Sequence, residues 1–134
     1  MYVRIVSMLV ASSVALAVGP SAPAQQGRSP KAARELEEAL SGRVASEPVD
    51  CIRESARMRV IDDSTILFRD RGVVYLQQPR AACRGLSKGM SLIRNSTGAT
   101  RLCSGDISSV VEMSSGFGSS TCVYSEFIPY KKIG

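Results

Sequence analysis

The four cysteines are the residues of this chain whose type and spacing most clearly indicate chemistry. The chain has 134 residues, with four Cys and no His. An even number of cysteines in a small exported chain is typical of two disulfides. A zinc site would need a close pair of cysteines or histidine ligands, and the sequence has neither. We therefore predict two disulfides, with three possible pairings between which the sequence does not choose, among Cys51, Cys83, Cys103 and Cys122.

A group of arginines is the second set of residues with a possible chemical role. Alternation places two of them on one face of a predicted strand, and the predicted register places Arg57 opposite Arg69 on the next strand. Like charges in such cross-strand positions destabilise a sheet, within a range of roughly 0.2–1 kcal/mol. In one interpretation the side chains splay into water, or Glu54 or Asp70 lies between them. In the other they form an anion-binding patch of Arg57, Arg59, Arg69 and Arg71.

The sequence contains no pattern that predicts catalysis. A serine hydrolase needs a base beside its nucleophile, and the chain has no His, no G-x-S-x-G and no S-x-x-K. The adjacent carboxylates Asp62 and Asp63 are explained by a hairpin turn, and no C-x-x-C pair is present. Three Phe, four Tyr and no Trp are few for stacking on nucleic-acid bases. We expect a protein that is not an enzyme, with no cofactor, no metal and no nucleic-acid partner.

The element that must position these arginines is a meander of three antiparallel strands over residues 57–77. Alternation of apolar and polar residues marks the first strand, and the Asp62-Asp63-Ser64 cluster is typical of a turn. If those three residues form the loop, Met58 faces Phe68 and Val60 faces Ile66.

The second turn of the meander allows two registers. A three-residue loop of Asp70-Arg71-Gly72 would oppose Phe68 to Val74 and Ile66 to Leu76, with Gly in the left-handed conformation. A two-residue loop of Arg71-Gly72 would instead oppose Ile66 to Gln77. We prefer the three-residue loop because it gives an inner face composed entirely of Met58, Val60, Ile66, Phe68, Val74 and Leu76. The outer face is mixed, so another element is expected to cover part of it.

The first 24 residues have the pattern of a secretory signal peptide. Arg4 supplies the charged start, Ile5 to Val18 is apolar, and Ala22-Pro23-Ala24 fits a cleavage site. The apolar run is shorter than the roughly 18 residues that a membrane span needs, so an uncleaved anchor is the lesser alternative. We predict cleavage after Ala24, no membrane span after cleavage, and a periplasmic or secreted location.

Residues 25–50 are predicted to form a disordered start, a short helix and a connector from Arg43 to Asp50. Ser29 would cap the helix, with Pro30 at its first position and Gly42 after its end. Residues 51–130 would form a disulfide-linked β domain, and residues 131–134 a tail. A Gly/Ser-rich loop is expected from Ser114 to Ser120, and a turn at residues 95–99. Strands after the meander are expected at Met90 to Arg94, Thr100 to Cys103, Ile107 to Met113 and Cys122 to Ile128.

Short motifs spread over residues 36–130 resemble an uncharacterised family of small exported bacterial proteins, catalogued as domain of unknown function sixty-four ninety-one. The motifs are GRVASEPVDCI (Gly42 to Ile52), VIDDSTILF (Val60 to Phe68), Cys83 with Leu86, Leu102-Cys103 with Asp106-Ile107, and Cys122 with Phe127 and Pro129. The chain departs from the family pattern at Tyr124-Ser125 and at Arg84. The resemblance implies export, a cysteine framework and a β-rich core. It implies no activity, because the family has none assigned.

Together these observations predict a mainly β protein, with a small antiparallel, barrel-like domain, a short N-terminal helix and two disulfides. The formal net charge of +5 is compatible with loose association with anionic polymers of the cell envelope. We expect a non-catalytic, envelope-associated binding or structural module whose partner is an anionic envelope polymer or a periplasmic protein. The alternative is a small protein inhibitor of a secreted or periplasmic hydrolase that presents the loop from Ser114 to Ser120.

Overall fold

The computed structural model describes residues 27–94, 100–116 and 118–134, and it is mainly β, as predicted. The predicted signal peptide and the predicted turn at residues 95–99 lie outside the described residues. The elements, in chain order, are α1 (Pro30–Leu40), β1 (Arg43–Ala45), β2 (Cys51–Arg53), β3 (Arg57–Asp62), β4 (Thr65–Asp70), β5 (Val73–Gln77), β6 (Met90–Arg94), β7 (Arg101–Cys103), β8 (Ile107–Glu112), β9 (Gly118–Val123) and β10 (Phe127–Lys132).

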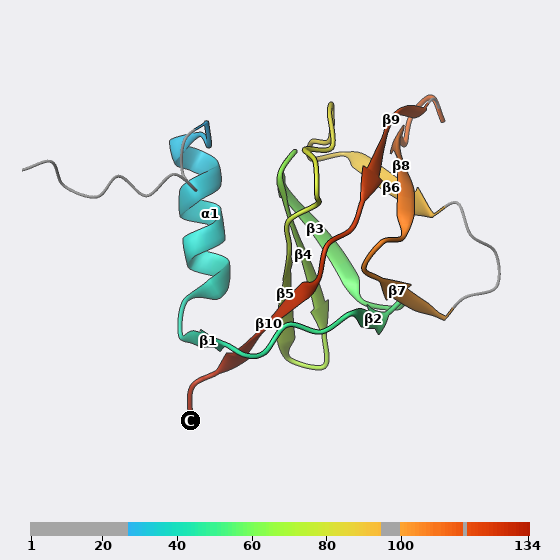
Figure 1. Cartoon of the computed structure of the whole chain (residues 1–134). Coiled ribbons are helices and arrows are strands. Elements are labelled where there is room, and N and C mark those ends of the chain that lie inside the picture. Colours follow the sequence, from blue (N-terminus) through green and yellow to red (C-terminus); the bar gives the residue numbers. More distant parts are fainter. Residues whose placement is uncertain (1–26, 95–99, 117) are drawn as a thin grey trace, which may run out of the picture.

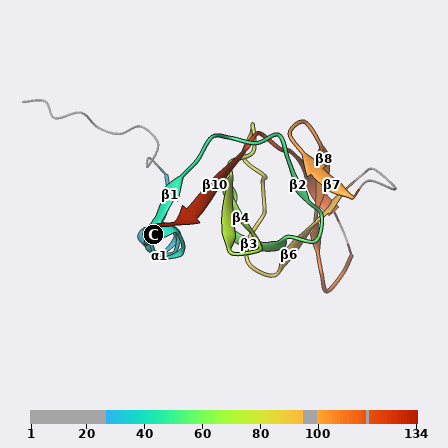
Figure 2. The ribbon, with the colours of Figure 1, turned by 90° about the horizontal axis from the view of Figure 1, so that it is seen from below.

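These strands form three antiparallel sheets. The largest has five strands in the order β1-β10-β5-β4-β3, and the others pair β2 with β7 and order β6-β8-β9. Viewed along the end of the molecule in Figure 2, the sheets curve around a common interior, while α1 lies outside the five-stranded sheet. Figure 1 shows the same helix standing beside that sheet, on the side away from β6 to β9.

The first hairpin of the meander has the predicted register. Met58 pairs with Phe68 and Val60 with Ile66. The loop is shorter than predicted, because Asp62 pairs with Thr65 and a β-bulge lies between Val60 and Asp62. The Asp62 carboxylate accepts hydrogen bonds from the backbone N–H (3.0 Å) and hydroxyl (2.9 Å) of Ser64, which stabilises the tight turn.

The preferred register of the second hairpin was wrong. Ile66 pairs with Gln77 and Phe68 with Tyr75, so the loop is the two-residue alternative, Arg71-Gly72. Both loop residues have positive φ, 48° and 80°, as a type I′ turn requires. The three-residue loop was preferred because it gave one wholly apolar face. That criterion was wrong because both faces of the sheet are covered by other elements, so apolar residues are buried on each. Gln77 can therefore be fully buried, since its amide exchanges hydrogen bonds with the backbone of Ser125 at 2.9 and 2.8 Å.

Helix α1 is the element that covers the outer face of the meander, where a covering element was expected. The Ser29 hydroxyl caps it by accepting a hydrogen bond from the Ala32 N–H at 3.1 Å, and Pro30 begins it. Ala32 is buried, with Leu36 and Leu40 packed beside it. The sheet contributes the rest of this outer cluster, which is Ile61, Leu67, Val74 and Leu76.

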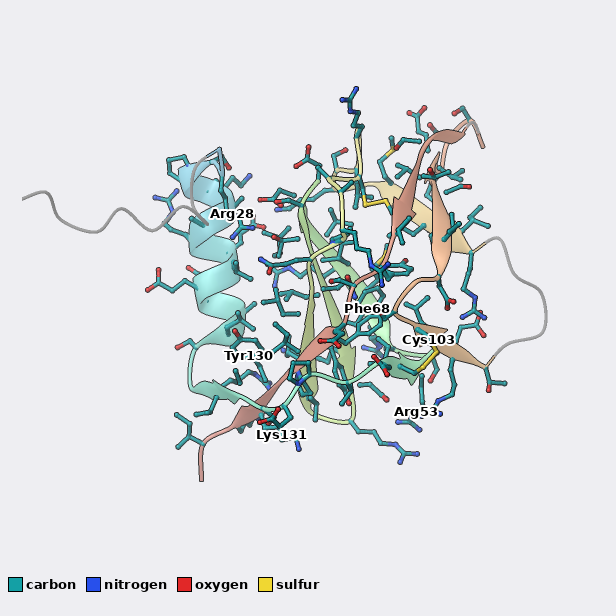
Figure 3. The ribbon with its side chains drawn as sticks, viewed as in Figure 1. Arg28, Arg53, Phe68, Cys103, Tyr130 and Lys131 are labelled. Atoms are coloured by element: carbon teal, nitrogen blue, oxygen red, sulfur yellow. A yellow bond between two sulfur atoms is a disulfide. The ribbon has the colours of Figure 1, made fainter. Side chains whose placement is uncertain are left out.

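The larger, inner cluster lies between the sheets. Phe68, Tyr124 and Phe127 form its centre, with ring centroids 5.8–6.2 Å apart. Figure 3 shows Phe68 between the five-stranded sheet and the opposite strands. The disulfide Cys83–Cys122 is part of this cluster, and Cys51–Cys103 joins β2 to β7 at its margin. The predicted pair of disulfides is thus present with this connectivity, which is consistent with an exported protein.

The strand boundaries differ from prediction at both ends of the chain. The predicted connector from Arg43 contains β1, which pairs with β10, and β10 continues to Lys132 in the predicted tail. The predicted last strand is divided between β9 and β10, and β9 begins at Gly118, inside the predicted Gly/Ser loop. The division occurs at Tyr124, whose ring is buried and whose backbone bonds Gly105 and Asp106 instead of a neighbouring strand.

Candidate functional site

The structure brings three of the four predicted anion-binding arginines onto one face. Arg57 on β3 is directly opposite Arg69 on β4, and Arg59 lies two residues further along β3. Arg59 pairs with Leu67, which belongs to the outer cluster, so all three arginines are on the side of the sheet that carries α1. Their side chains are exposed.

Neither carboxylate expected to lie between these arginines does so. Asp70 binds Arg53 through two hydrogen bonds of 2.8 and 2.7 Å, and Glu54 is 3.8 Å from Arg94. Within the described part of the chain, no hydrogen bond or ion pair involves the side chain of Arg57 or Arg69. Of the first interpretation, only the version in which both side chains extend into water remains. The two guanidinium groups are therefore available to an external anion.

Arg59 is partly engaged. Its Nη2 lies 3.9 Å from Glu35 Oε2 on α1, at the outer limit of an ion pair, and its side chain is 56% exposed. Glu35 also accepts a hydrogen bond from Lys88, which binds the other carboxylate oxygen. Because the contact is long and more than half of the side chain is exposed, most of the Arg59 guanidinium is accessible.

Arg71, the fourth predicted residue, lies apart from the other three. It occupies the first position of the β4–β5 turn with φ of 48°, at the tip of the hairpin. Residues of its flanking strands line the hollows beside Arg57 and Arg69, but Arg71 lines neither. We therefore leave Arg71 out of the site.

Two adjoining hollows lie between the last turns of α1 and the sheet. The smaller has a volume of about 220 Å³ and includes Arg57, Leu67 and Val74 in its lining. The larger has about 520 Å³ and includes Arg43, Lys132 and Glu38. They share Ala39, Arg59 and Arg69, so we treat them as one cationic groove. Its charged lining is Arg43, Arg57, Arg59, Arg69, Lys132 and the single carboxylate Glu38.

Sequence reasoning missed Arg43 and Lys132. They form a cross-strand pair between β1 and β10, in segments that were interpreted as a connector and a tail. Arg43 is held in place because its Nη1 donates to the carbonyl oxygens of Gly72 (2.7 Å) and Tyr130 (3.2 Å). No clear local signal indicates this pairing, because FIPYKK does not alternate between apolar and polar residues.

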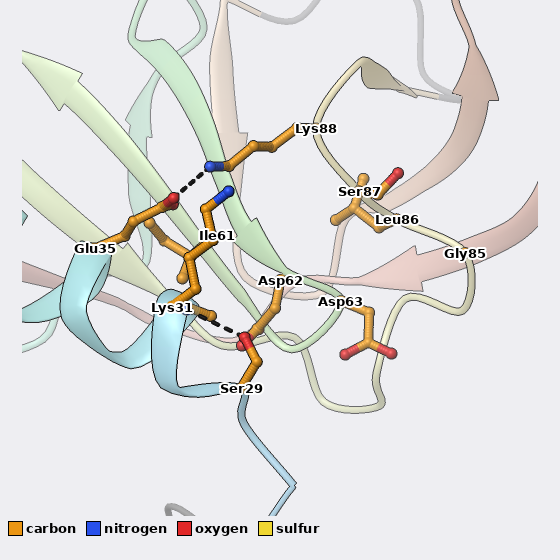
Figure 4. Close-up of a pocket in the computed structure, with 11 residues that line it drawn as sticks. Ser29, Lys31, Glu35, Ile61, Asp62, Asp63, Gly85, Leu86, Ser87 and Lys88 are labelled. Atoms are coloured by element: carbon orange, nitrogen blue, oxygen red, sulfur yellow. Dashed lines mark hydrogen bonds and ion pairs between the residues drawn. The ribbon is translucent and has the colours of Figure 1, made fainter.

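A third hollow, of about 520 Å³, lies at the other end of α1, against the loop that carries Leu86 (Figure 4). Two ion pairs lie at this hollow: Lys88 binds Glu35, and Arg28, beside the lining, binds Asp62 at 2.8 Å. The remaining charged lining residues, Lys31 and Asp63, are exposed and of opposite sign. The hydrogen bond from Lys88 lowers the pKa of Glu35. Burial opposes ionisation of Asp62, but hydrogen bonds from Arg28 and Ser64 outweigh it and lower the pKa of Asp62. The first pair joins α1 to the loop before β6, and the second joins the segment before α1 to β3. The hollow has no excess of cations that would attract an anion.

Two further kinds of site, a metal centre and a membrane-spanning helix, were looked for among the described residues. In that part of the chain, no group of three or more Cys, Asp or Glu side chains is placed to hold a metal ion. None of the helical structure seen there is long and apolar enough to cross a bilayer.

Comparison with known proteins gave no match to a family model, to a curated protein or to a solved structure. The resemblance to the uncharacterised family of exported proteins stays a prediction.

Proposed function

We propose that this protein is an exported, non-catalytic module of the cell envelope that binds an anionic polymer through Arg57, Arg59 and Arg69. The observation that carries the proposal is the directly opposed pair of Arg57 and Arg69, which has no carboxylate between its members. Such a pair destabilises the free sheet. An anionic ligand that accepts hydrogen bonds from both guanidinium groups would remove that repulsion.

Export and the absence of catalysis rest on separate arguments. The signal pattern in residues 1–24 and the two disulfides favour an oxidising compartment. The chain has no His to serve as a base, and the charged residues that line the third hollow compensate one another. A guanidinium groove supplies binding by charge and hydrogen bonds.

The test is retention on an immobilised anionic polymer, measured as the salt concentration that elutes the oxidised full-length protein. Arg57→Thr/Arg69→Thr should elute at much lower salt than the wild type, because exposed charge interactions are screened and depend on the number of cations. Thr suits a strand, so the fold should persist. The matched control, Arg84→Thr/Arg101→Thr, removes the same charge from two exposed arginines outside the groove. Equal elution of the two double variants would refute the proposal.

A second candidate function, inhibition of a secreted or periplasmic hydrolase, is favoured by the exposed side chain of Met113. Its side chain is 71% exposed and immediately precedes the segment predicted as a Gly/Ser loop, at the end of the β8–β9 hairpin. A hairpin that presents an exposed apolar side chain suits insertion into a hydrolase pocket. An inhibitor would form a 1:1 complex that survives high salt and is abolished by Met113→Asp, whereas Arg57→Thr/Arg69→Thr would not affect it.

A further inference from the structure

The guanidinium of Arg43 is drawn across the sheet toward the strand that carries Arg69. Its Nη1 donates to the carbonyl oxygens of Tyr130 on β10 and Gly72 in the β4–β5 turn. Arg43 itself lies on β1, and the strand order is β1-β10-β5-β4. The side chain must therefore extend over β10 to reach the turn. Its charged end lies in the larger hollow of the groove, which Arg69 lines as well.

Lys132 is located beneath this extended side chain. The register places it directly opposite Arg43 and in line with Gly72. At the usual spacings of strands and residues, the Cα atoms of Arg69 and Lys132 are roughly 12 Å apart. Side chains as long as those of Arg and Lys span such a distance from both ends, and all three cations line the same hollow. One ligand group can therefore contact Arg43, Arg69 and Lys132 together.

These three cations have hydrogen-bond donors to spare. In the part of the chain that the structure describes, the side chains of Arg69 and Lys132 take part in no hydrogen bond or ion pair. Arg43 uses only Nη1, so its Nε and Nη2 keep their donors. Because two carbonyl oxygens already hold its guanidinium, less side-chain freedom is lost when a ligand binds.

The hollow carries more positive charge than a carboxylate can neutralise. Its lining has four cationic side chains, of which Arg59 is the fourth, and the single carboxylate Glu38, which leaves an excess of three positive charges. A carboxylate brings one negative charge and two oxygens. A phosphomonoester brings about 1.5 to 2 negative charges at neutral pH and three acceptor oxygens. The phosphomonoester therefore matches both the charge and the number of converging donors better.

From these features we infer that the larger hollow binds a phosphomonoester group, held between Arg43, Arg69 and Lys132. This inference rests on the proposed anion-binding function and specifies the acidic group of the ligand. The two guanidinium groups suit the phosphate oxygens through paired hydrogen bonds, and the ammonium group acts as a point charge. An envelope polymer and a lipid headgroup can both carry such a group, and the experiment distinguishes these sources.

The experiment measures the affinity of the full-length oxidised protein for glycerol 3-phosphate at low salt, by titration followed with NMR at pH 5 and pH 7. The chain has no His, the side chain whose ordinary pKa lies in this range, so a change with pH reports the ligand. A phosphomonoester gains its second negative charge near pH 6. Binding of glycerol 3-phosphate should therefore tighten severalfold, whereas binding of sulfate should stay constant and galacturonate should bind more weakly than either at pH 7.

Two neighbouring lysines provide a matched pair of variants. Lys132→Gln should weaken glycerol 3-phosphate about tenfold at pH 7, the size expected for one hydrogen bond to a charged group. Lys131→Gln removes the same charge from an exposed residue of β10 that pairs with Val44 and does not line the hollow. It should change the affinity far less. Glu38→Gln should tighten binding, because it removes the one carboxylate from the lining.

The outcomes separate this inference from the proposed function. No binding of phosphate, sulfate or polygalacturonate by the wild type would overturn both. Galacturonate that binds as tightly as glycerol 3-phosphate, or equal weakening by Lys132→Gln and Lys131→Gln, would overturn the inference alone.

The source of the phosphate group is tested by displacement of bound glycerol 3-phosphate. Displacement by vesicles that contain phosphatidic acid would identify a lipid as the carrier, and displacement by a phosphorylated glucan would identify a polymer. Either result supports the inference. Displacement by neither would overturn it, because the hollow would then be closed to a phosphate carried on a larger molecule.

Discussion

The two faces of the five-stranded sheet are covered in different ways. The inner face packs against β2 and against β-strands and loops from the second half of the chain, around three aromatic rings and a buried disulfide. The outer face packs against a single helix of 11 residues whose only buried side chain is Ala32. An opposed sheet can close completely over the inner face, whereas a short helix covers a narrow stripe. The margin that the helix leaves open is the cationic groove.

The two faces therefore differ in what they contribute, one to stability and the other to binding. The inner cluster should provide most of the free energy of unfolding, because its residues are fully buried and drawn from distant segments. The outer face combines a modest apolar contact with charges that remain accessible. Changes to the inner face should therefore act on stability, and changes at the margin of the outer face should act on binding.

The largest effect is expected from removing the disulfide in the inner cluster. Cys83→Ala/Cys122→Ala opens a loop of 39 residues and should lower the free energy of unfolding by about 4 kcal/mol through chain entropy, with a further loss from the vacated volume. The Cys51–Cys103 disulfide closes a similar loop of 52 residues at a half-buried position. Cys51→Ala/Cys103→Ala should therefore lose a similar entropy contribution but less from vacated volume, and cost less in total. Denaturant unfolding of the two variants makes the comparison. A greater loss from Cys51→Ala/Cys103→Ala would contradict a dominant inner cluster.

A pair of apolar truncations compares the two faces directly. Phe127 is fully buried against Phe68 and Tyr124, so Phe127→Ala should cost about 3–5 kcal/mol. Leu36 on α1 is only half-buried, and Leu36→Ala should cost clearly less, about 1–2 kcal/mol. Urea unfolding measures both, with Glu37→Ala on the exposed side of α1 as the control. If Leu36→Ala were as damaging as Phe127→Ala, the helix would be as important to stability as the inner sheets.

The ion pair between Arg28 and Asp62 tests how firmly the start of α1 is held. The pKa of Asp62 is lowered in the folded protein, so the carboxylate stabilises the fold above its unfolded pKa of about 3.9 and loses that contribution as pH falls through the lower folded pKa. Asp62→Asn should cost about 1–2 kcal/mol at neutral pH, since hydrogen bonds to a charged group are lost. The difference from the wild type should shrink steadily below pH 4. A constant difference down to pH 2 would show that the charge of Asp62 is not what matters.

The part of the fold that could be predicted from sequence follows the same division between the two faces. The β3–β4 register was predictable because Met58, Val60, Ile66 and Phe68 alternate cleanly toward the inner cluster. The β4–β5 register was not, because Val74 and Leu76 are buried on the outer face and Gln77 on the inner one, which reverses the usual apolar pattern. That reversal depends on a helix and on Ser125, both distant in the chain, and local alternation carries no information about either.

The candidate site was half predictable for a related reason. Arg57, Arg59 and Arg69 belong to one local hairpin, so their proximity follows from its register. Arg43 and Lys132 are brought to the groove by a pairing of the first strand with the last. Neighbouring residues in the chain do not reveal a contact that spans nearly the whole domain.

The smallest effect is expected from the arginine pair itself, and its sign is the informative part. Arg57→Thr/Arg69→Thr should stabilise the free protein, by an amount within the roughly 0.2–1 kcal/mol of cross-strand pairs, because it removes an uncompensated like-charge contact. The gain should diminish at 1 M salt, where the repulsion is screened in the wild type as well. The same variant should lose binding to the anionic polymer. Thermal melts at low and high salt, compared with Arg84→Thr/Arg101→Thr, separate this effect from a general reduction of net charge. Arg101 is also opposite an arginine, Arg53, but Asp70 already neutralises that residue. A destabilised double variant would mean that Arg57 and Arg69 support the hairpin, and the outer margin would then serve stability in the same way as the inner face.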